Sequence, residues 1–316
     1  MNTYHTLLTA LVMCLISMPA TAASTNGELV AWGDNALGQT TVPAGNDFKA
    51  IAAGGHHNIG LKTDGSLAGW GWNGSGQTNV PSGNNFTTIA AGLFHNVALM
   101  SDGSLAAWGD NFYGQTTVPS GNNFVAVAAG AGYSLAVKAD GSLVGWGRNF
   151  EGQTNVPSGN NFVAVAAGHY HGLALMADGS LTSWGLNNFG QTNVPSGNNF
   201  VAIDAGEFHS FALKADGSLS GWGESSWGQT NVPLGNNFVA IGAAGSHSLA
   251  LRADGSLAGW GRNDFGQATV PAGTNFIAIS AGQQHSLAIQ VPEPGIWPLI
   301  CMALIGVLGL RGRIEA

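Results

Sequence analysis

Charged residues and cysteine are both scarce in this sequence. Charged residues make up 8% of the 316-residue chain, and 9 lysines and arginines stand against 17 acidic residues, for a formal net charge of −8. Binding to a nucleic-acid backbone requires clustered basic side chains that displace counterions, so this charge balance argues against a nucleic-acid partner. The only two cysteines, Cys14 and Cys301, lie in short apolar segments near the two ends. The body between them therefore has no disulfide, and its stability must come from its core.

The apolar segment near the N-terminus is short. It extends from Leu7 to Ile16 and is followed by Pro19 and the small-residue pattern Ala20-Thr21-Ala22. A short apolar run before such a cleavage pattern is typical of a signal peptide. We therefore expect residues 1–23 to be a signal peptide and the protein to be exported.

A second apolar segment lies near the C-terminus, from Gly295 to Leu310. As a helix it would span roughly 24 Å, which is short for a bilayer core of about 30 Å. Arg311 and Arg313 follow it, and the positive-inside rule places them in the cytoplasm. The sequence therefore predicts a transmembrane segment at 295–310 that anchors the exported body to the inner membrane.

Between these ends the chain repeats with a period of 38 residues. Asp-Gly-Ser recurs at Asp64, Asp102, Asp140, Asp178, Asp216 and Asp254, and one further step back reaches Asn26. Seven units fill the body, assigned as residues 24–291, and such a period is typical of a solenoid or propeller. The 49 glycines without a Gly-X-Y period agree with many short strands and tight turns.

Several residue types recur at fixed offsets from the first residue of each repeat, counted as zero. Offset 6 is always tryptophan: Trp32, Trp70, Trp108, Trp146, Trp184, Trp222 and Trp260. Offset 22 is always phenylalanine: Phe48, Phe86, Phe124, Phe162, Phe200, Phe238 and Phe276. Gly-Gln occupies offsets 12 and 13, and Val-Pro occupies offsets 16 and 17. Because these aromatic side chains bury large areas, we expect them to fill the space between stacked repeats.

Each repeat reads as four short strands, in the second unit Ser66–Trp70, Gln77–Val80, Phe86–Ala91 and His95–Met100. Asp-Gly suits a two-residue hairpin turn that leads into the next copy. We therefore predict an all-β fold, a seven-bladed β-propeller of four-stranded sheets. Glu28–Trp32 and His285–Gln290 would lack hairpin partners, so we expect Leu29–Trp32 to pair with Ser286–Gln290 and close the ring.

The repeat resembles a known family. The pattern Trp-Gly-x-Asn-x-x-Gly-Gln at Trp108–Gln115, with Ala-Gly-x-x-His before the aliphatic strand, resembles the regulator-of-chromosome-condensation repeat. The Gly-Gln-Thr-x-Val-Pro ending is similar to a compact secreted bacterial branch, which includes a propeller inhibitor of β-lactamases. The C-terminal tail, 292–316, resembles a PEP-CTERM sorting signal. That likeness implies an exosortase-type sorting partner and a motif formed by Pro292, Glu293, Pro294, Arg311 and Arg313.

Histidine recurs at offset 31, but its pattern does not favour a metal site. The six copies are His57, His95, His171, His209, His247 and His285, with Tyr133 in the remaining repeat. Equivalent positions in a ring lie one per blade, too far apart to share one ion. We interpret these histidines as structural and bonded to the backbone. Most carboxylates belong to the Asp-Gly turns, and no acid pair or nucleophile motif is visible. We therefore expect no catalytic activity, no metal and no cofactor.

The seven copies differ most at offsets 8–11 and 29–30. Strand parity places these two loops on one face of the propeller, while the nearly invariant Asp-Gly and Ser-Gly-Asn-Asn turns share the other. Aromatic residues on loops of a rigid scaffold are typical of binding interfaces. The predicted ligand-binding residues are Trp72, Phe94, Phe112, Tyr113, Phe150, Tyr170, Phe208 and Trp227. For Phe189, Trp227 and Phe265, packing against the neighbouring blade is an equal alternative.

These observations predict an exported, monomeric propeller at the cell surface or in the matrix that binds an extracellular protein or polysaccharide. One alternative is an inhibitor of an extracellular enzyme such as a β-lactamase. Another is a propeller enzyme acting on polysaccharides.

Overall fold

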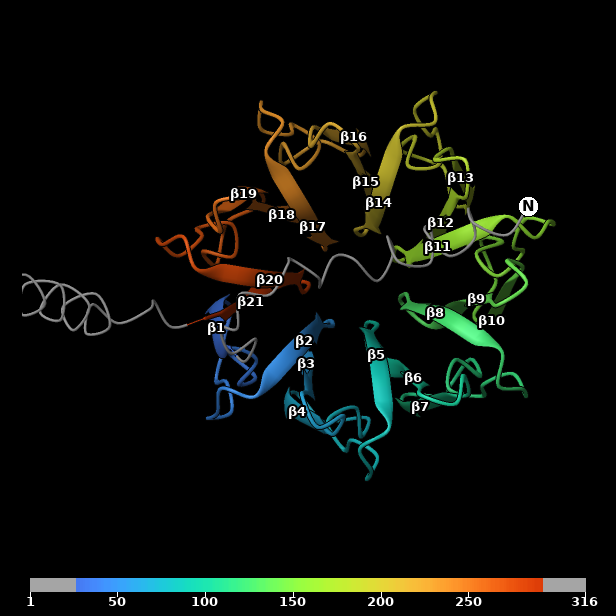
Figure 1. The fold of residues 1–316 in the computed structure, drawn as a ribbon, viewed down its shortest axis with the longest axis horizontal. Helices are drawn as coiled ribbons and strands as arrows, with labels where there is room; N and C mark the ends of the chain where they lie inside the picture. The colour runs from blue at the N-terminus through green and yellow to red at the C-terminus, as the bar shows by residue number, and fades with distance from the viewer. Residues whose placement is uncertain (1–26, 292–316) are drawn as a thin grey trace, which may run out of the picture.

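The computed structural model describes residues 27–291, so the predicted signal peptide and sorting tail lie outside the described residues. The described chain forms seven three-stranded sheets, arranged as blades around a central axis (Figure 1). The all-β, seven-bladed architecture that the 38-residue period predicts is confirmed. No helix within residues 27–291 could cross a bilayer.

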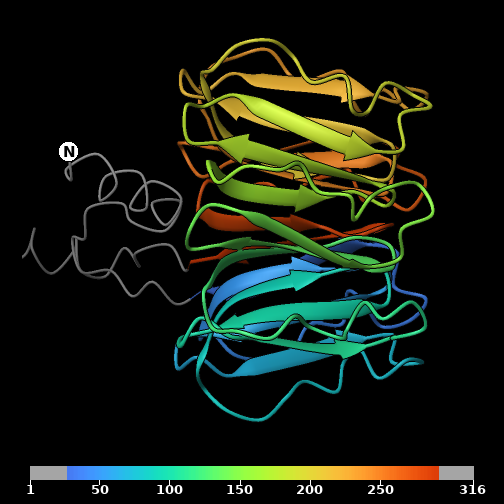
Figure 2. The ribbon, with the colours of Figure 1, turned by 90° about the vertical axis from the view of Figure 1, so that its right-hand side faces the viewer.

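Each blade has an inner, a middle and an outer strand. The inner strands are β2 (Phe48–Ala53), β5 (Phe86–Ala91), β8 (Phe124–Ala129), β11 (Phe162–Ala167), β14 (Phe200–Ala205), β17 (Phe238–Ala244) and β20 (Phe276–Ala281). The middle strands are β3 (His57–Lys62), β6 (His95–Met100), β9 (Tyr133–Lys138), β12 (His171–Met176), β15 (His209–Lys214), β18 (His247–Arg252) and β21 (His285–Gln290). The outer strands are β4 (Leu67–Gly71), β7 (Leu105–Gly109), β10 (Leu143–Gly147), β13 (Leu181–Gly185), β16 (Leu219–Gly223), β19 (Leu257–Gly261) and β1 (Glu28–Gly33). Seen from the side, the strands run between two layers of loops (Figure 2).

The prediction of four strands per blade is wrong, because the segment Gln77–Val80 and its equivalents form no strand. Its backbone amides are bonded locally: Thr78 N donates to Asn73 Oδ1 at 3.0 Å, and Val80 N to Thr78 O at 3.0 Å. The segment lies over the outer strand, since a Cβ on Gly69 would come within 2.7 Å of Thr78 O. Asparagine at offset 9, present in six copies, therefore holds this segment as a packed loop.

The predicted ring closure is confirmed. β1 pairs antiparallel with β21 over all six residues, from Glu28 opposite Gln290 to Gly33 opposite His285. The last blade thus combines strands from both ends of the described chain (Figure 1). This pairing removes the two free edges that an open ring would expose.

The core lies in the seams between blades. The middle strands are buried on both faces over five consecutive residues, as in His247–Leu251, because a sheet packs on each side of them. Phe162, which begins an inner strand, packs against Val137 of the preceding blade, and Trp184 joins the same cluster. The prediction that the repeated tryptophan and phenylalanine fill the space between blades is confirmed.

Candidate binding face

The two variable loops of each blade meet on one side of the ring. The backbone N–H at offset 8 donates to the carbonyl at offset 30 in every blade, as from Trp72 to His56 and from Glu224 to Phe208, both at 2.9 Å. We call the side formed by offsets 8–11 and 29–30 the variable face. The Asp-Gly and Ser-Gly-Asn-Asn turns meet at the other ends of the strands, where Phe86 N donates to Gly65 O, and form the constant face. The grouping predicted from strand parity is thus observed.

A buried glutamine at offset 13 holds each outer loop in the same conformation. Its Oε1 accepts the backbone N–H at offset 11 in all seven blades, as from Tyr113 to Gln115 at 2.8 Å. The intervening glycine has a positive φ, 81° at Gly114, which disfavours other residues there. The loops therefore vary in side chains on a fixed backbone.

The repeated histidines lie in the seams, not on the variable face. All six are fully buried. Each Nε2 contacts a serine or asparagine side chain of the next blade, as in His57 to Asn96 Oδ1 and His95 to Ser134 Oγ, both at 2.9 Å. The expected structural role is thus observed, but the expected bond to backbone is wrong. Offset 32 supplies the polar side chain from the neighbouring blade, 39 residues away in five contacts and 227 residues away in the contact of His285 with Asn58.

Geometry fixes the protonation of these histidines. The asparagine amide and the serine hydroxyl donate onward to a glutamine carbonyl, as from Ser134 to Gln115 O at 3.0 Å, so Nε2 must carry the proton and donate. The six Nδ1 atoms have no hydrogen-bond partner. Burial lowers the pKa of His57 to about 4 and, with the neighbouring His57, that of His95 to about 3. The ring is therefore neutral at pH 7.

Tyr133 replaces the histidine in one blade and uses the same seam differently. Its hydroxyl donates to Gly168 O at 3.0 Å and also contacts His171 O. The next blade has Gly172 at offset 32, so no side chain there could accept from an imidazole. Burial raises the pKa of Tyr133 well above its usual value.

Half of the variable face carries a continuous group of aromatic side chains. We call Phe112, Tyr113, Phe150, Tyr170, Phe189 and Phe208, together with Arg148, the aromatic arc. Tyr113 contacts Phe150 edge-on at 5.7 Å between ring centroids, and Tyr170 stacks on Phe208 at 5.5 Å. Phe112 and Phe150 are 81% and 75% exposed, whereas Tyr170 and Phe208 are half-buried. The arc therefore crosses four adjacent blades, from β5–β7 to β14–β16.

Three of the eight predicted binding residues lie outside the arc. Trp72 and Phe94 form their own edge-on pair at 5.3 Å. Trp227 lies beside Arg262, whose guanidinium is 5.1 Å from the indole ring. Phe189, Trp227 and Phe265, for which interblade packing was the alternative, are 49%, 50% and 46% exposed. Phe189 does contact Phe208 of the next blade, at 5.0 Å, so packing and exposure coexist there.

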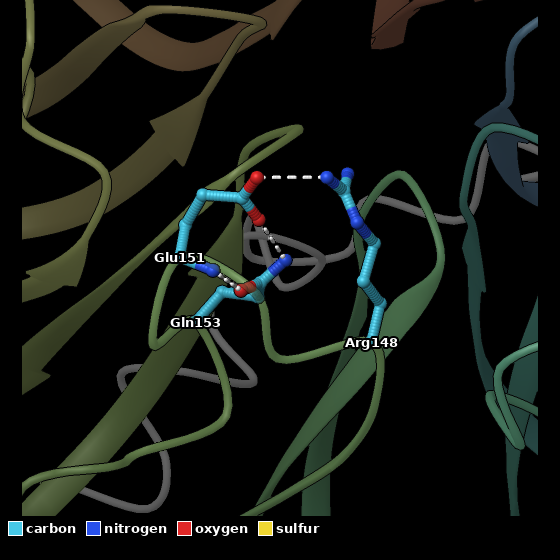
Figure 3. Close-up of polar contacts among 3 residues, drawn as sticks. All are labelled: Arg148, Glu151 and Gln153. Atoms are coloured by element: carbon cyan, nitrogen blue, oxygen red, sulfur yellow. Dashed lines mark hydrogen bonds and ion pairs between the residues drawn. The ribbon is translucent and has the colours of Figure 1, made fainter.

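Arg148 is the residue of this face that the sequence reasoning missed. Its guanidinium lies 6.0, 5.2 and 4.9 Å from the rings of Tyr113, Phe150 and Tyr170. Its Nη2 pairs with Glu151 Oε1 at 2.7 Å, and Glu151 Oε2 accepts from Gln153 Nε2 at 2.9 Å (Figure 3). The signal available in the sequence was a cation at offset 8, where most copies have an acidic or apolar residue.

The variable face as a whole is acidic. Its carboxylates are Asp34, Asp110, Glu151, Glu207, Glu224 and Asp264, against two cations, Arg148 and Arg262. His169 lies 3.8 Å from Glu207, but burial lowers its pKa to about 4, so it adds no charge at pH 7. Burial raises the pKa of Glu207, and the adjacent Glu224 adds to this effect, while Arg262 opposes it. Such a face does not attract phosphate.

The inner strands surround a channel of about 260 Å³. Asp204 is the one carboxylate among the described residues that line it. Its two oxygens accept the N–H groups of Ala205 and Ala243 at 2.9 and 2.8 Å, and burial raises its pKa to about 6. Within residues 27–291 no three His, Cys, Asp or Glu side chains gather as a metal site. Among the described residues, neither a pair of carboxylates nor a set of metal ligands therefore lines the channel.

The closed ring and its repeated seams define the class of fold, a seven-bladed β-propeller. Six segments match the family model described as "Regulator of chromosome condensation (RCC1) repeat": residues 48–77, 86–115, 124–153, 162–191, 200–229 and 238–267. Each segment spans one blade, from its inner strand to the buried glutamine, and together they cover more than half of the chain. The chain belongs to the RCC1 repeat family. The seventh blade combines both ends of the described chain, so no contiguous segment contains it.

Solved structures show the same fold. Prp20p from Saccharomyces cerevisiae is 18% identical, with a TM-score of 0.74 over 97% of this chain and 98% of that chain. Yeast RCC1 (Prp20) bound to Kap60 is 20% identical, with a TM-score of 0.73 over 88% and 95% of the two chains. Human WBSCR16 is 18% identical, with a TM-score of 0.68 over 84% and 99%. The sequence matches none of the curated proteins with which it was compared.

Proposed function

We propose that this protein is an exported propeller of the compact secreted type, displayed at the cell surface or in the matrix, whose variable face binds a macromolecular partner. The observation that carries the proposal is the aromatic arc: exposed and half-buried rings from four blades, joined by ring contacts and by Arg148, on a backbone fixed by the same hydrogen bonds in every copy. Exposed aromatic side chains held on a rigid scaffold anchor interfaces at little entropic cost.

The chemistry of the arc favours a protein partner. Phenylalanine supplies four of its six rings and has no polar atom to bond a sugar hydroxyl. Arg148 is already paired with Glu151, so it offers packing surface and a partly satisfied guanidinium. A partner with an apolar patch beside basic residues would complement both the rings and the surrounding carboxylates.

The ends of the chain support export and retention. The predicted signal peptide leads to export, and the motif Pro292-Glu293-Pro294 with Arg311 and Arg313 is the basis for sorting by an exosortase-type enzyme. Inner-membrane anchoring through 295–310 would precede this processing, followed by display on the cell surface or release.

Binding can be tested with proteins secreted by the producing cell. Alanine variants of Phe150, Tyr170 and Phe208 in the aromatic arc should each weaken capture of the partner, whereas Leu234→Ala, an exposed change on the constant face, should leave it unchanged. Equal capture by all four variants would refute the face assignment. Capture of purified exopolysaccharide instead of protein would reassign the partner class.

Two assays separate the other functions that the sequence leaves open. Inhibition of a β-lactamase by the purified protein, lost in Tyr170→Ala, would make the partner an enzyme and the function inhibition. Release of reducing ends from polysaccharide would show catalysis. We expect no turnover, because Asp204 is the one carboxylate along the channel in the described part of the chain.

A further inference from the structure

Both ends of the described chain lie on the constant face. Glu28, the first residue of β1, is paired directly with Gln290, the last residue of β21. Val291 N donates to Asn275 O at 3.0 Å, and Asn275 belongs to the turn that precedes β20. The chain therefore leaves the ring from the face opposite the aromatic arc.

The connection from this point to the apolar segment is short. Only Pro292, Glu293 and Pro294 separate Val291 from Gly295, where that segment begins. Four Cα steps reach at most about 14 Å, whatever conformation they adopt. Two of the three residues are proline, whose ring fixes φ and narrows the range further. A segment inserted in a bilayer would therefore hold the end of β21 close to the membrane surface.

The exposed apolar residues differ between the two faces. On the constant face they are aliphatic: Val125, Leu234, Val239 and Ile277, at 52%, 99%, 38% and 41% exposure. Val125, Val239 and Ile277 are second residues of inner strands, at a β-bulge present in all seven blades. On the variable face the exposed large hydrophobic residues are aromatic apart from Leu37.

The charge on the constant face is mixed. Five of the seven described cations lie there: Lys49, Lys62, Lys138, Lys214 and Arg252. The six Asp-Gly carboxylates lie on the same face, and Asp47 pairs with Lys62 at 3.1 Å. This face would not adsorb to anionic lipid by charge alone, so the tether must determine the orientation.

We infer that the constant face is the membrane-facing side of the anchored propeller, with a lipid bilayer beneath it, and that the variable face projects away from the membrane. This inference rests on the anchoring role of 295–310 in the proposed function. Six-residue strands separate the two faces by about 20 Å. The aromatic arc would thus stand clear of the lipid headgroups and be open to a soluble partner.

Single-cysteine labelling can test the orientation, because the body between Cys14 and Cys301 has no cysteine of its own. In the full chain with Cys14→Ser and Cys301→Ser, a fluorophore is attached at Ser120→Cys or Leu234→Cys on the constant face. Matched variants carry it at Ala36→Cys or Asn188→Cys, exposed positions on the variable face. The proteins are reconstituted in phosphatidylcholine vesicles containing a headgroup-nitroxide lipid. We expect several-fold stronger quenching at the two constant-face positions.

A longer tether should remove this difference. Inserting ten Gly/Ser residues between Pro294 and Gly295 should bring the quenching at the two faces closer together, since the body could then rotate. If the protein floats with the vesicles but both faces are quenched equally without the insertion, the proposed orientation is wrong, although the segment 295–310 still anchors the protein. If the protein does not float with the vesicles, the anchoring itself is wrong, and the orientation falls with it.

Discussion

The seams between blades and the variable face are built by the same repeat, but the seams keep the same side chains in nearly every copy while the variable face changes them. In every seam the tryptophan N–H donates to the offset-13 glutamine carbonyl of the preceding blade, as from Trp146 to Gln115 at 2.9 Å. Six seams add a buried histidine that bonds to the next blade. On the variable face the backbone bonds recur equally, but the side chains at offsets 8, 10, 11, 29 and 30 differ. The residues that stabilise the fold and those proposed to bind a partner therefore occupy different offsets. Substitutions in the seams should change stability, and substitutions on the variable face should change binding.

Acidification should have the largest effect on the seams. Burial holds the pKa of His57 and His247 at about 4 and that of His95, His171, His209 and His285 at about 3. Below pH 6.5 the unfolded chain therefore binds protons that the folded chain cannot bind, so the contribution of these histidines to stability is constant above about pH 7 and falls from pH 6.5 towards 4. Within that window each histidine lowers the free energy of unfolding by about 1.4 kcal/mol per pH unit, so six lower it by roughly 8 kcal/mol per pH unit. Asp204, whose pKa is raised to about 6, opposes this by one proton between pH 3.8 and 6 and so offsets His169, whose pKa burial lowers to about 4. Since domains have about 5–15 kcal/mol in total, we expect unfolding near pH 5.

Thermal unfolding measured from pH 8 to 4.5 checks this expectation. Replacing His209 and His247 with glutamine should reduce the slope of the melting temperature against pH by about a third, whatever these changes do at pH 8. A melting temperature that stays constant down to pH 4.5 would show that the buried histidines protonate without cost.

Removing a seam tryptophan should have the next largest effect. Trp146 packs against Leu99, Leu105 and Phe124, so Trp146→Ala should cost about 3–5 kcal/mol in the free energy of unfolding. Trp146→Phe is the matched control, because it keeps most of the packing and loses only the N–H. Gln115 O still accepts from Ser134, so this variant should cost about 0.5–1.5 kcal/mol. Urea unfolding measures both, and equal losses would show that the hydrogen bond outweighs the packing.

The exceptional seam at Tyr133 should tolerate the consensus residue poorly. Tyr133→His would place a buried Nε2–H opposite Gly172, which has no side chain to accept it. An unpaired buried donor costs about 1–3 kcal/mol, so the variant should melt at a lower temperature than the natural chain. A variant as stable as the natural chain would mean that a backbone carbonyl, such as Gly168 O, can accept from imidazole as well as from tyrosine.

The sequence was sufficient to predict what the period and the repeated residue types determine. These are the seven blades, the closure of β1 on β21 and the grouping of loops into two faces. It was not sufficient for the segment Gln77–Val80, which was predicted as a strand but whose amides bond locally, Thr78 N to Asn73 Oδ1 and Val80 N to Thr78 O. The partner of each histidine was also missed, because offset 32 of the next blade is distant in sequence. Arg148 was overlooked because its role depends on rings from two neighbouring blades.

Truncating the exposed aromatics should change stability least and binding most. Phe112 and Phe150 are 81% and 75% exposed, so alanine at either position should alter the free energy of unfolding by less than about 0.5 kcal/mol. Phe208 is half-buried between Tyr170 and Phe189, and its loss should cost about 1–2 kcal/mol because two aromatic contacts disappear. Each of the three alanine substitutions should weaken binding of the captured partner by about 1–3 kcal/mol if the side chain is an anchor.

Melting temperature and affinity measured on the same samples therefore give a diagnostic pattern, in which Phe112→Ala lowers affinity at an unchanged melting temperature. If Phe112→Ala and Phe150→Ala left affinity unchanged while Trp72→Ala or Trp227→Ala reduced it, the partner would bind outside the aromatic arc, and the contact between neighbouring rings would be packing alone.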